Sequence, residues 1–235
     1  MQVVYSDETS SVVPEKATYG IIFCLPGNTF SGRFLDSFIN VLMYCIKNGI
    51  NFIVSRQEDS VVYYVRNKCL GGSVLRGEKQ LPFDGKINYT HIMWIDSDTI
   101  FSVKHFEALL KHSDLDIVAG VYSMADGRHY AAVEQWDEEY FQKNGTFRFL
   151  PIEEFKDKKG LMEMVYSGFG FVLVKKGVFE TVGYPWFRPI FHSIGEDIKD
   201  FSSEDVSFCL CAREKGFKIF IDPEIRVGHE KKMIL

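Results

Sequence analysis

Two aspartates separated by one residue follow an apolar run near the middle of the chain. In HIMWIDSDTIF, residues 91–101, the apolar part ends at Ile95, and Asp96 and Asp98 then flank Ser97. In extended chain these two side chains point the same way, with their Cα atoms roughly 6–7 Å apart. Carboxylate oxygens in such an arrangement suit Mg²⁺ or Mn²⁺, which also prefer phosphate oxygens. The pair indicates a divalent-cation site that engages a diphosphate, with an acidic turn as the alternative.

A second group of residues suited to chemistry lies near the C-terminus. Glu204 and Asp205 stand at the start of an expected helix, and His229 follows the last expected strand. Ser202 and Asp205 have the spacing of a capping box, and acids in a first helical turn are stabilised by the helix dipole. Capping accounts for one acid, which leaves the other as a candidate general base. A histidine near a carboxylate-bound cation is a natural further ligand, although a lone histidine is more often structural.

Alternating apolar elements must position these residues. The first half shows strand patterns at 19–26, 51–55, 91–95 and 116–123, separated by helical patterns at 33–47, 61–70 and 103–112. This alternation predicts an α/β fold with a mostly parallel central sheet flanked by helices. The second half predicts a small antiparallel extension within 125–167, a strand and short helix within 170–183, a helix at 203–216 and a strand at 217–223.

The carboxyl ends of the predicted parallel strands carry the suggestive residues. Ligands of such sheets bind beyond these ends, so Pro26-Gly27, Ser55-Arg56 and residues 96–98 are expected on one edge. The chain also provides a contrast in Asp114-Leu115-Asp116, which precedes its strand. That segment is expected at the opposite edge, with no metal role.

The composition of the chain limits the classes of protein to which it can belong. A chain of 235 residues with 46% hydrophobic residues supports one domain, 19–235, preceded by a loose leader at 1–18. The net charge of −5 gives no electrostatic case for nucleic acid as the main partner. Five cysteines without a CxxC pair favour a reducing compartment. No apolar run is long enough to span a bilayer and no signal pattern is present, so we expect a cytoplasmic protein, in the host cytoplasm if the source is viral.

Several motifs, taken in order, resemble a known family. Asp96-Ser97-Asp98, SGFGFVLVKKGVFE at 167–180, PWF at 185–187, SEDVSFC at 203–209 with AREKGFKI, and Gly228-His229 look like those of a GT-A glycosyltransferase. The chain is most similar to the family 2-like, metal-dependent, inverting enzymes, including those of large DNA viruses and phages. The resemblance covers residues 19–231.

The resemblance implies a role for each matching position. It implies a nucleotide-sugar donor, UDP-linked, bound by the first half (19–123), and a glycan or other hydroxyl-bearing acceptor bound by the second (124–235). It implies Mn²⁺ or Mg²⁺ as cofactor and Asp205 as the base with Glu204 in reserve. Pro189, Gly195 and mixed charge within 186–201 indicate a mobile lid over the donor. Metal ligands would be Asp96, Asp98 and His229, and Trp186 would stack on the acceptor, with ordinary packing as its alternative. Donor contacts would come from Pro26, Gly27, Ser55, Arg56, Arg66, Asn67, Asp96, Ser97, Gly168, Phe169 and Gly170.

Three other functions compete with this interpretation. A sugar-nucleotide pyrophosphorylase would need a denser glycine-rich, basic loop than PGNTFSGR at 26–33. A phosphatase of the haloacid dehalogenase type would need a threonine two residues after the second aspartate, whereas Thr99 follows Asp98 directly. A silent carbohydrate- or nucleotide-binding module would have lost a carboxylate or His229, and none is missing.

Overall fold

The central sheet is built from short apolar strands that are buried on both faces. The computed structural model describes residues 3–4 and 20–231, and all six residues of β2 (Ile21–Pro26) are buried in it. Alternate side chains of this strand serve two separate cores: Ile22 and Cys24 pack in one, and Ile21 and Phe23 in the other. Burial on both faces explains why the segment is continuously apolar rather than alternating.

The main sheet has eight strands in the order β1-β3-β2-β4-β12-β6-β15-β10. Four pairings are parallel, whereas β12 runs antiparallel to both neighbours and β10 runs antiparallel to β15. The predicted α/β fold with a mainly parallel sheet is confirmed. The bounds of the remaining strands are β1 (Val3–Val4), β3 (Phe52–Gln57), β4 (His91–Ile95), β6 (Ile117–Val121), β10 (Met162–Met164), β12 (Phe171–Lys175) and β15 (Ile219–Arg226).

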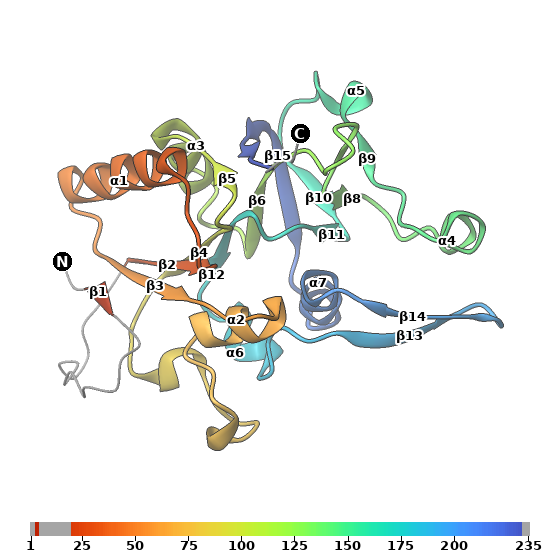
Figure 1. Ribbon diagram of the computed structural model, residues 1–235, viewed down its shortest axis with the longest axis horizontal. Helices are drawn as coiled ribbons and strands as arrows, with labels where there is room; N and C mark the ends of the chain where they lie inside the picture. The colour runs from red at the N-terminus through yellow and green to blue at the C-terminus, as the bar shows by residue number, and fades with distance from the viewer. Residues whose placement is uncertain (1–2, 5–19, 232–235) are drawn as a thin grey trace.

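Helices cover both faces of this sheet (Figure 1). On one face lie α1 (Gly32–Lys47) and α3 (Val103–Leu110); on the other lie α2 (Val62–Cys69), α6 (Val178–Val182) and α7 (Glu204–Glu214). The start of α1 follows from its cap, since the Ser31 hydroxyl accepts a hydrogen bond from the Phe34 N–H at 3.1 Å. Each predicted helix of the first half is present, with ends shifted by one or two residues.

Short antiparallel pairs form where an extension was predicted, within 125–167, and two further pairs lie outside that segment. They are β8 (Ala132–Val133) with β11 (Tyr166–Ser167), β7 (His129–Tyr130) with β9 (Leu150–Pro151), β13 (Ile190–Ile194) with β14 (Ile198–Ser202), and β5 (Thr99–Ile100) with β16 (Gly228–His229). Two short helices, α4 (Glu138–Asn144) and α5 (Ile152–Phe155), and two 3₁₀ turns, Val74–Arg76 and Pro82–Gly85, complete the described chain. The segment expected to form a lid contains the β13–β14 hairpin, which projects from the body beside α7 (Figure 1).

The two sequence halves share one sheet. Strand β12 of the second half lies between β4 and β6 of the first, so β6 joins the other first-half strands only through β12. The expected leader falls outside the described residues except at Val3–Val4, which pair with β3 at the sheet edge. None of the helices in the described part of the chain combines the length and hydropathy that a bilayer crossing requires.

Candidate active site

Three strand ends meet at one edge of the sheet, as predicted. Strands β3, β2 and β4 are parallel neighbours, which brings Gly27 next to the loop after β4. Gly27 has φ of +140°, and a Cβ there would lie 2.8 Å from Cβ and Oγ of Ser97. Only glycine fits this approach of two backbones. Arg56 joins the same edge, since its guanidinium donates to the Gly27 carbonyl at 3.0 Å.

The second acidic pair lies at the opposite edge. Strands β4 and β6 are both antiparallel to β12 and therefore parallel to each other, so residues 114–116 precede β6 at its amino end. There the Asp116 carboxylate accepts a hydrogen bond from the Lys218 N–H at 3.3 Å. The predicted contrast between the two D-x-D segments is confirmed in position.

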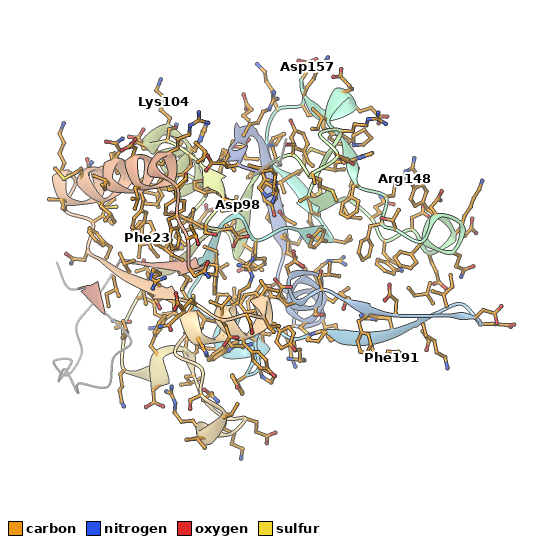
Figure 2. The ribbon with its side chains drawn as sticks, viewed as in Figure 1. Phe23, Asp98, Lys104, Arg148, Asp157 and Phe191 are labelled. Carbon is orange, nitrogen blue, oxygen red and sulfur yellow. The ribbon has the colours of Figure 1, made fainter. Side chains whose placement is uncertain are left out.

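A two-residue ladder brings His229 to Asp98. In the β5–β16 pairing His229 lies opposite Thr99, and the Glu230 N–H donates to the Asp98 carbonyl at 2.7 Å. The Asp98 carboxylate then lies 3.1 Å from Nε2 of His229 and 2.7 Å from Nζ of Lys231. We refer to Asp98, His229 and Lys231 as the open cluster, because the Asp98 side chain is 40% exposed. Asp98 lies near the middle of the molecule in Figure 2.

The tautomer of His229 is determined by its other nitrogen. Nδ1 lies 2.8 Å from the Ser123 carbonyl, which can only accept, so Nδ1 carries a proton. Nε2 therefore either carries a second proton and donates to Asp98, or is unprotonated and able to bind a metal ion. The hydrogen bond to Asp98 raises the pKa of His229. Burial alone would raise the pKa of Asp98, but hydrogen bonds from His229 and Lys231 lower it to about 2.

Arg66 joins the D-x-D segment to the acidic start of α7. Its Nη2 lies 3.0 Å from both carboxylate oxygens of Asp96, and its Nε lies 3.1 Å from Glu204. The guanidinium carbon sits 5.6 to 5.8 Å from three ring centroids, those of Trp94, Phe169 and Phe187. The Arg66 side chain is 4% exposed. We refer to Arg66, Asp96 and Glu204 as the buried cluster.

Burial dominates the electrostatics of the buried cluster. Desolvation raises the pKa of Asp96, and the charge of Arg66 opposes that rise. Desolvation and the neighbouring Asp205 raise the pKa of Glu204, again against Arg66. Burial would lower the pKa of Arg66, but the two carboxylates raise it, so the cation persists at every ordinary pH. Among the described residues no acceptor reaches Nη1 of Arg66, which leaves the N–H groups of this nitrogen for water or a ligand oxygen.

Asp205 faces a different set of partners from its neighbour Glu204. The Tyr166 hydroxyl donates to one Asp205 oxygen at 2.9 Å, and the Ser203 hydroxyl donates to the other. The predicted capping box of Ser202 with Asp205 is wrong, because Ser203 is the N-cap of α7. The Ser202 hydroxyl instead lies 2.7 Å from that of Ser207. The Val206 N–H also donates to Asp205 at 2.8 Å, and within the described part of the chain Asp205 forms no salt bridge.

The small residues at 168 and 170 make room for an aromatic ring. A Cβ at Gly168 would lie 2.1 Å from the Tyr122 hydroxyl oxygen, and one at Gly170 would lie 2.7 Å from the same ring. Tyr122 in turn packs edge-on against His229, with ring centroids 5.1 Å apart. The Gly170 carbonyl accepts from the Asp96 N–H at 3.1 Å, which ties this segment to the D-x-D loop.

Three predicted ligand contacts are occupied by structural contacts. Trp186 is 1% exposed and its indole N–H donates to the Phe179 carbonyl at 3.0 Å, so the prediction that it stacks on an acceptor is wrong. The Asn67 amide is used in bonds to Tyr63 and to both backbone groups of Phe187. The Ser55 hydroxyl donates to the Cys69 carbonyl at 2.7 Å.

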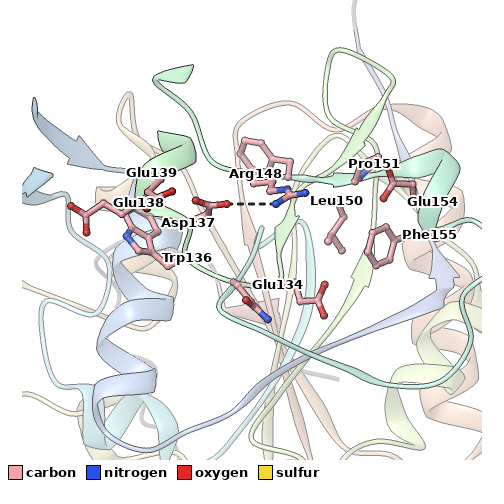
Figure 3. Close-up of a pocket in the computed structure, with 12 residues that line it drawn as sticks. Glu134, Trp136, Asp137, Glu138, Glu139, Arg148, Leu150, Pro151, Glu154 and Phe155 are labelled. Atoms are coloured by element: carbon pink, nitrogen blue, oxygen red, sulfur yellow. Dashed lines mark ion pairs between the residues drawn. The ribbon is translucent and has the colours of Figure 1, made fainter. Parts of the chain in front are cut away.

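A cavity of about 500 Å³ opens between the segments before α4 and around α5 (Figure 3). Phe149 lines it and also packs against Tyr166, with ring centroids 6.4 Å apart. Trp136, 42% exposed, offers an aromatic surface there. The polar lining is acidic, with one ion pair across 3.6 Å between Arg148 and Asp137; the other carboxylates are Glu134, Glu138, Glu139 and Glu154.

Sequence reasoning missed four residues of this region. Tyr122 lies in the strand predicted at 116–123, Trp136 and Tyr166 lie in the predicted antiparallel extension, and Lys231 follows the last predicted strand. For Lys231 a signal existed, because Lys231 follows His229 by two residues and shares its side of an extended chain. The other three carried no signal, since a single aromatic residue in such a segment is as often core as site.

The metal-ligating side chains gather only in part. Within residues 3–4 and 20–231, no group of three or more His, Cys, Asp or Glu side chains could hold a metal ion. Asp98 and His229 do adjoin, and they offer a carboxylate and an imidazole nitrogen of known tautomer. Such a pair fits Mn²⁺ or Mg²⁺ if phosphate oxygens of a ligand supply the other positions. Both carboxylate oxygens of Asp96, in contrast, are paired with Arg66.

Comparison with known proteins identifies the fold. No protein-family model and no curated protein matches the chain. Among solved structures, A197 from STIV is similar with a TM-score of 0.50 at 15% identity, over 92% of this chain and 96% of that one. The glycosyltransferase GalNAc-T7, solved with UDP, GalNAc and Mn²⁺, is similar with a TM-score of 0.54 at 12% identity, over 92% of this chain. The chain spans 44% of that structure. The chain therefore has a GT-A-like fold.

Proposed function

We propose that this protein is a glycosyltransferase that moves a sugar from a UDP-linked donor to a hydroxyl acceptor with the help of Mn²⁺ or Mg²⁺. The observation that carries the proposal is the Arg66 bridge, which joins Asp96 of the D-x-D loop to Glu204 of the acid pair. It brings a candidate cation site and a candidate base to one edge of a GT-A-like sheet. A bare acidic turn would have no reason to meet a second acidic site through a buried arginine.

The donor diphosphate would lie against the open cluster. When bound there, a divalent cation held by Asp98 and His229 would neutralise charge that develops on the leaving phosphates. Ser123 keeps Nε2 of His229 directed at Asp98, and Lys231 adds a positive charge at the same carboxylate. The bend at Gly27 leaves the ends of β2 and β4 in contact, where the nucleoside would bind. The other predicted donor contacts, except those at Ser55 and Asn67, are part of this proposal, and Asp96 takes part by holding Arg66.

Asp205 is the base that the geometry favours. Glu204 is buried against Arg66, whereas Asp205 accepts hydrogen bonds from the Tyr166 and Ser203 hydroxyls and the Val206 N–H, and Tyr166 packs against Phe149 of the cavity lining. A carboxylate there can take the proton of an incoming hydroxyl while the sugar–phosphate bond breaks on the opposite face, which inverts the anomeric centre. Tyr166 would hold the carboxylate in line for that transfer.

The acceptor would enter through the cavity lined by Phe149. Trp136 takes the role predicted for Trp186, because an exposed indole can stack on the apolar face of a sugar ring. The carboxylates around it can accept hydrogen bonds from sugar hydroxyls. An acidic lining also disfavours anionic acceptors.

A donor panel tests the proposed activity. UDP-, GDP-, dTDP- and ADP-sugars are incubated with the protein and Mn²⁺, and we expect nucleoside diphosphate release from a UDP-sugar that stops with EDTA. Asp114→Ala, in the D-x-D segment at the other edge, is the matched control and should keep full activity. No release from any donor with either metal would contradict the proposal. Release of pyrophosphate from a nucleoside triphosphate and a sugar phosphate would favour the pyrophosphorylase alternative instead.

Two conservative variants separate the candidate bases. We expect Asp205→Asn to lower transfer by about 10²- to 10⁴-fold while donor binding persists. Glu204→Gln should lower transfer less, because the Glu204 carboxylate is paired with Arg66 and is not free to take a proton from the acceptor. The reverse result would assign the base to Glu204, and retention of the anomeric configuration in the product would remove the base from the mechanism.

A further inference from the structure

Helix α1 carries a large apolar stripe on its outer side. Four aliphatic side chains, each 48% to 59% exposed, recur at a spacing of four, four and three residues: Leu35, Ile39, Met43 and Ile46. At about 100° per residue this spacing places them within one sector of roughly 80°. The opposite side of α1 is also apolar and is buried in the core, at Phe34, Phe38, Val41 and Cys45. A surface helix normally has one such face, so the outer stripe indicates an interaction surface.

Two opposite charges flank this stripe on the same side. Asp36 and Lys47 are both exposed and lie roughly 100° and 120° around the helix from Leu35, just beyond Met43. They are eleven residues apart, or about 16 Å along the axis, so one lies at each end of the stripe. The midpoint between them falls at residues 41–42, close to the middle of the stripe itself.

We propose that the stripe packs against the same stripe of a second copy of this chain, with the two α1 helices antiparallel. A twofold axis perpendicular to the helix at residues 41–42 keeps each flank on its own side and reverses the helix direction. Asp36 of each copy then lies level with Lys47 of the other, and Ile39 packs between Met43 and Ile46 of the other. The surface is thus self-complementary in both shape and charge, as an isologous interface requires.

The alternative arrangements leave charged side chains of this surface without a partner or next to like charge. A parallel pairing about an axis along the helices swaps the flanks, which leaves Asp36 and Lys47 without partners and aligns the two helix dipoles unfavourably. Insertion of the stripe into an anionic bilayer surface would bring Asp36 and a chain of net charge −5 against like charge. A second copy is the occupant that these charges favour.

The size of the surface limits the affinity. One helix face buries less than the roughly 800 Å² per partner of a stable complex, so association is expected in the micromolar range. Because α1 covers the sheet face opposite α7, the dimer leaves both candidate active sites open.

Sedimentation velocity of the full chain, from low to high micromolar concentration, tests the surface. We expect a concentration-dependent dimer that Ile39→Glu abolishes at all concentrations, with the far-ultraviolet circular dichroism of the variant unchanged. Leu75→Glu is the matched control, because Leu75 is an apolar side chain 94% exposed away from α1, and it should dimerise normally. A wild-type chain that stays monomeric, or an Ile39→Glu chain that dimerises normally, would overturn the proposal.

A charge exchange tests the antiparallel register. Lys47→Asp places two carboxylates side by side at each end and should weaken the dimer roughly tenfold at low salt. Adding Asp36→Lys to that variant should restore the affinity. A double variant no tighter than the single one would overturn the register. Binding of the monomer to vesicles of phosphatidylcholine and phosphatidylglycerol, lost in Ile39→Glu, would assign the stripe to a lipid surface and overturn the dimer.

Discussion

The two aspartates of the D-x-D segment, one residue apart, end in opposite environments. Asp96 belongs to the buried cluster, where Arg66 is covered by three aromatic rings and held between two carboxylates. Asp98 belongs to the open cluster, where a histidine and a lysine share one half-exposed carboxylate. The buried cluster has a structural role, whereas in the open cluster a ligand can replace one of the partners of Asp98. A short acidic motif can thus combine a scaffold residue with a ligand-binding one.

Removal of Arg66 should give the largest effect on stability. Arg66→Met leaves Asp96 and Glu204 buried without their cation, which should lower the free energy of unfolding by about 3–5 kcal/mol in urea titrations. Arg56→Met is the control, because its ion pair with Glu58 is exposed and should be worth less than about 1 kcal/mol. Equal losses in the two variants would contradict the distinction between buried and open clusters.

Removal of Asp98 should lower the activity strongly and the free energy of unfolding only slightly. We expect Asp98→Ala to lower metal-dependent turnover by about 100-fold or more, because the proposed cation loses its carboxylate ligand. Its unfolding free energy should change by less than about 1 kcal/mol, since the carboxylate is partly solvated already. Steady-state kinetics and urea titration of the same preparation measure both quantities. A stability loss as large as that of Arg66→Met would place Asp98 in the scaffold.

Two tryptophans extend the comparison to the acceptor side. Trp136→Ala should reduce transfer to acceptor by about tenfold, through a higher acceptor KM, while hydrolysis of the donor by water is unchanged. Trp186→Ala should instead destabilise the fold by about 3–5 kcal/mol, because its ring is fully buried. If Trp136→Ala lowers hydrolysis and transfer equally, the cavity is not an acceptor site.

The smallest expected effect is the pH dependence of the open cluster without metal. The folded pKa of His229 is raised, so its ion pair with Asp98 stabilises fully below the unfolded pKa near 6.5 and is lost as pH rises through the folded value. Asp98, with a pKa of about 2, stays ionised throughout this range. We expect the Tm of the wild type to fall by about 1–2 °C between pH 6 and 8, and we expect this fall to be absent in His229→Gln. Stabilisation by Mn²⁺ should grow over the same range, because the ligand nitrogen must be unprotonated.

Apolar patterning predicted the frame of the molecule well. Strands β2, β4 and β6 are buried on both faces and therefore form unbroken apolar runs, and the helices between them have clear stripes. Parallel pairing then made the shared edge of Gly27, Asp96 and Asp98 predictable. The projecting β13–β14 hairpin was not predictable, because its strands are only partly buried and carry no strict alternation.

The contacts within the site depended on tertiary packing. His229 reaches Asp98 through a ladder of two residues, too short to leave a pattern, so its place after the last strand and the family resemblance were the only pointers to it. Trp186 was misplaced because the sequence PWF shows an aromatic residue but not which way its ring turns. Tyr166 could not be linked to Asp205 from sequence, since their meeting requires β11 to lie beside α7.

Binding of Mn²⁺ with and without UDP tests the central proposal most directly. Electron paramagnetic resonance of free Mn²⁺ gives its affinity for the wild type, Asp98→Ala and the control Asp114→Ala. We predict that UDP strengthens Mn²⁺ binding by tenfold or more in the wild type and in Asp114→Ala, because diphosphate oxygens complete the ligand set. In Asp98→Ala this UDP-dependent binding should be lost. Equal Mn²⁺ affinity in the three proteins, unchanged by UDP, would contradict the proposal that Asp98 and His229 hold the cation of a nucleotide-sugar donor.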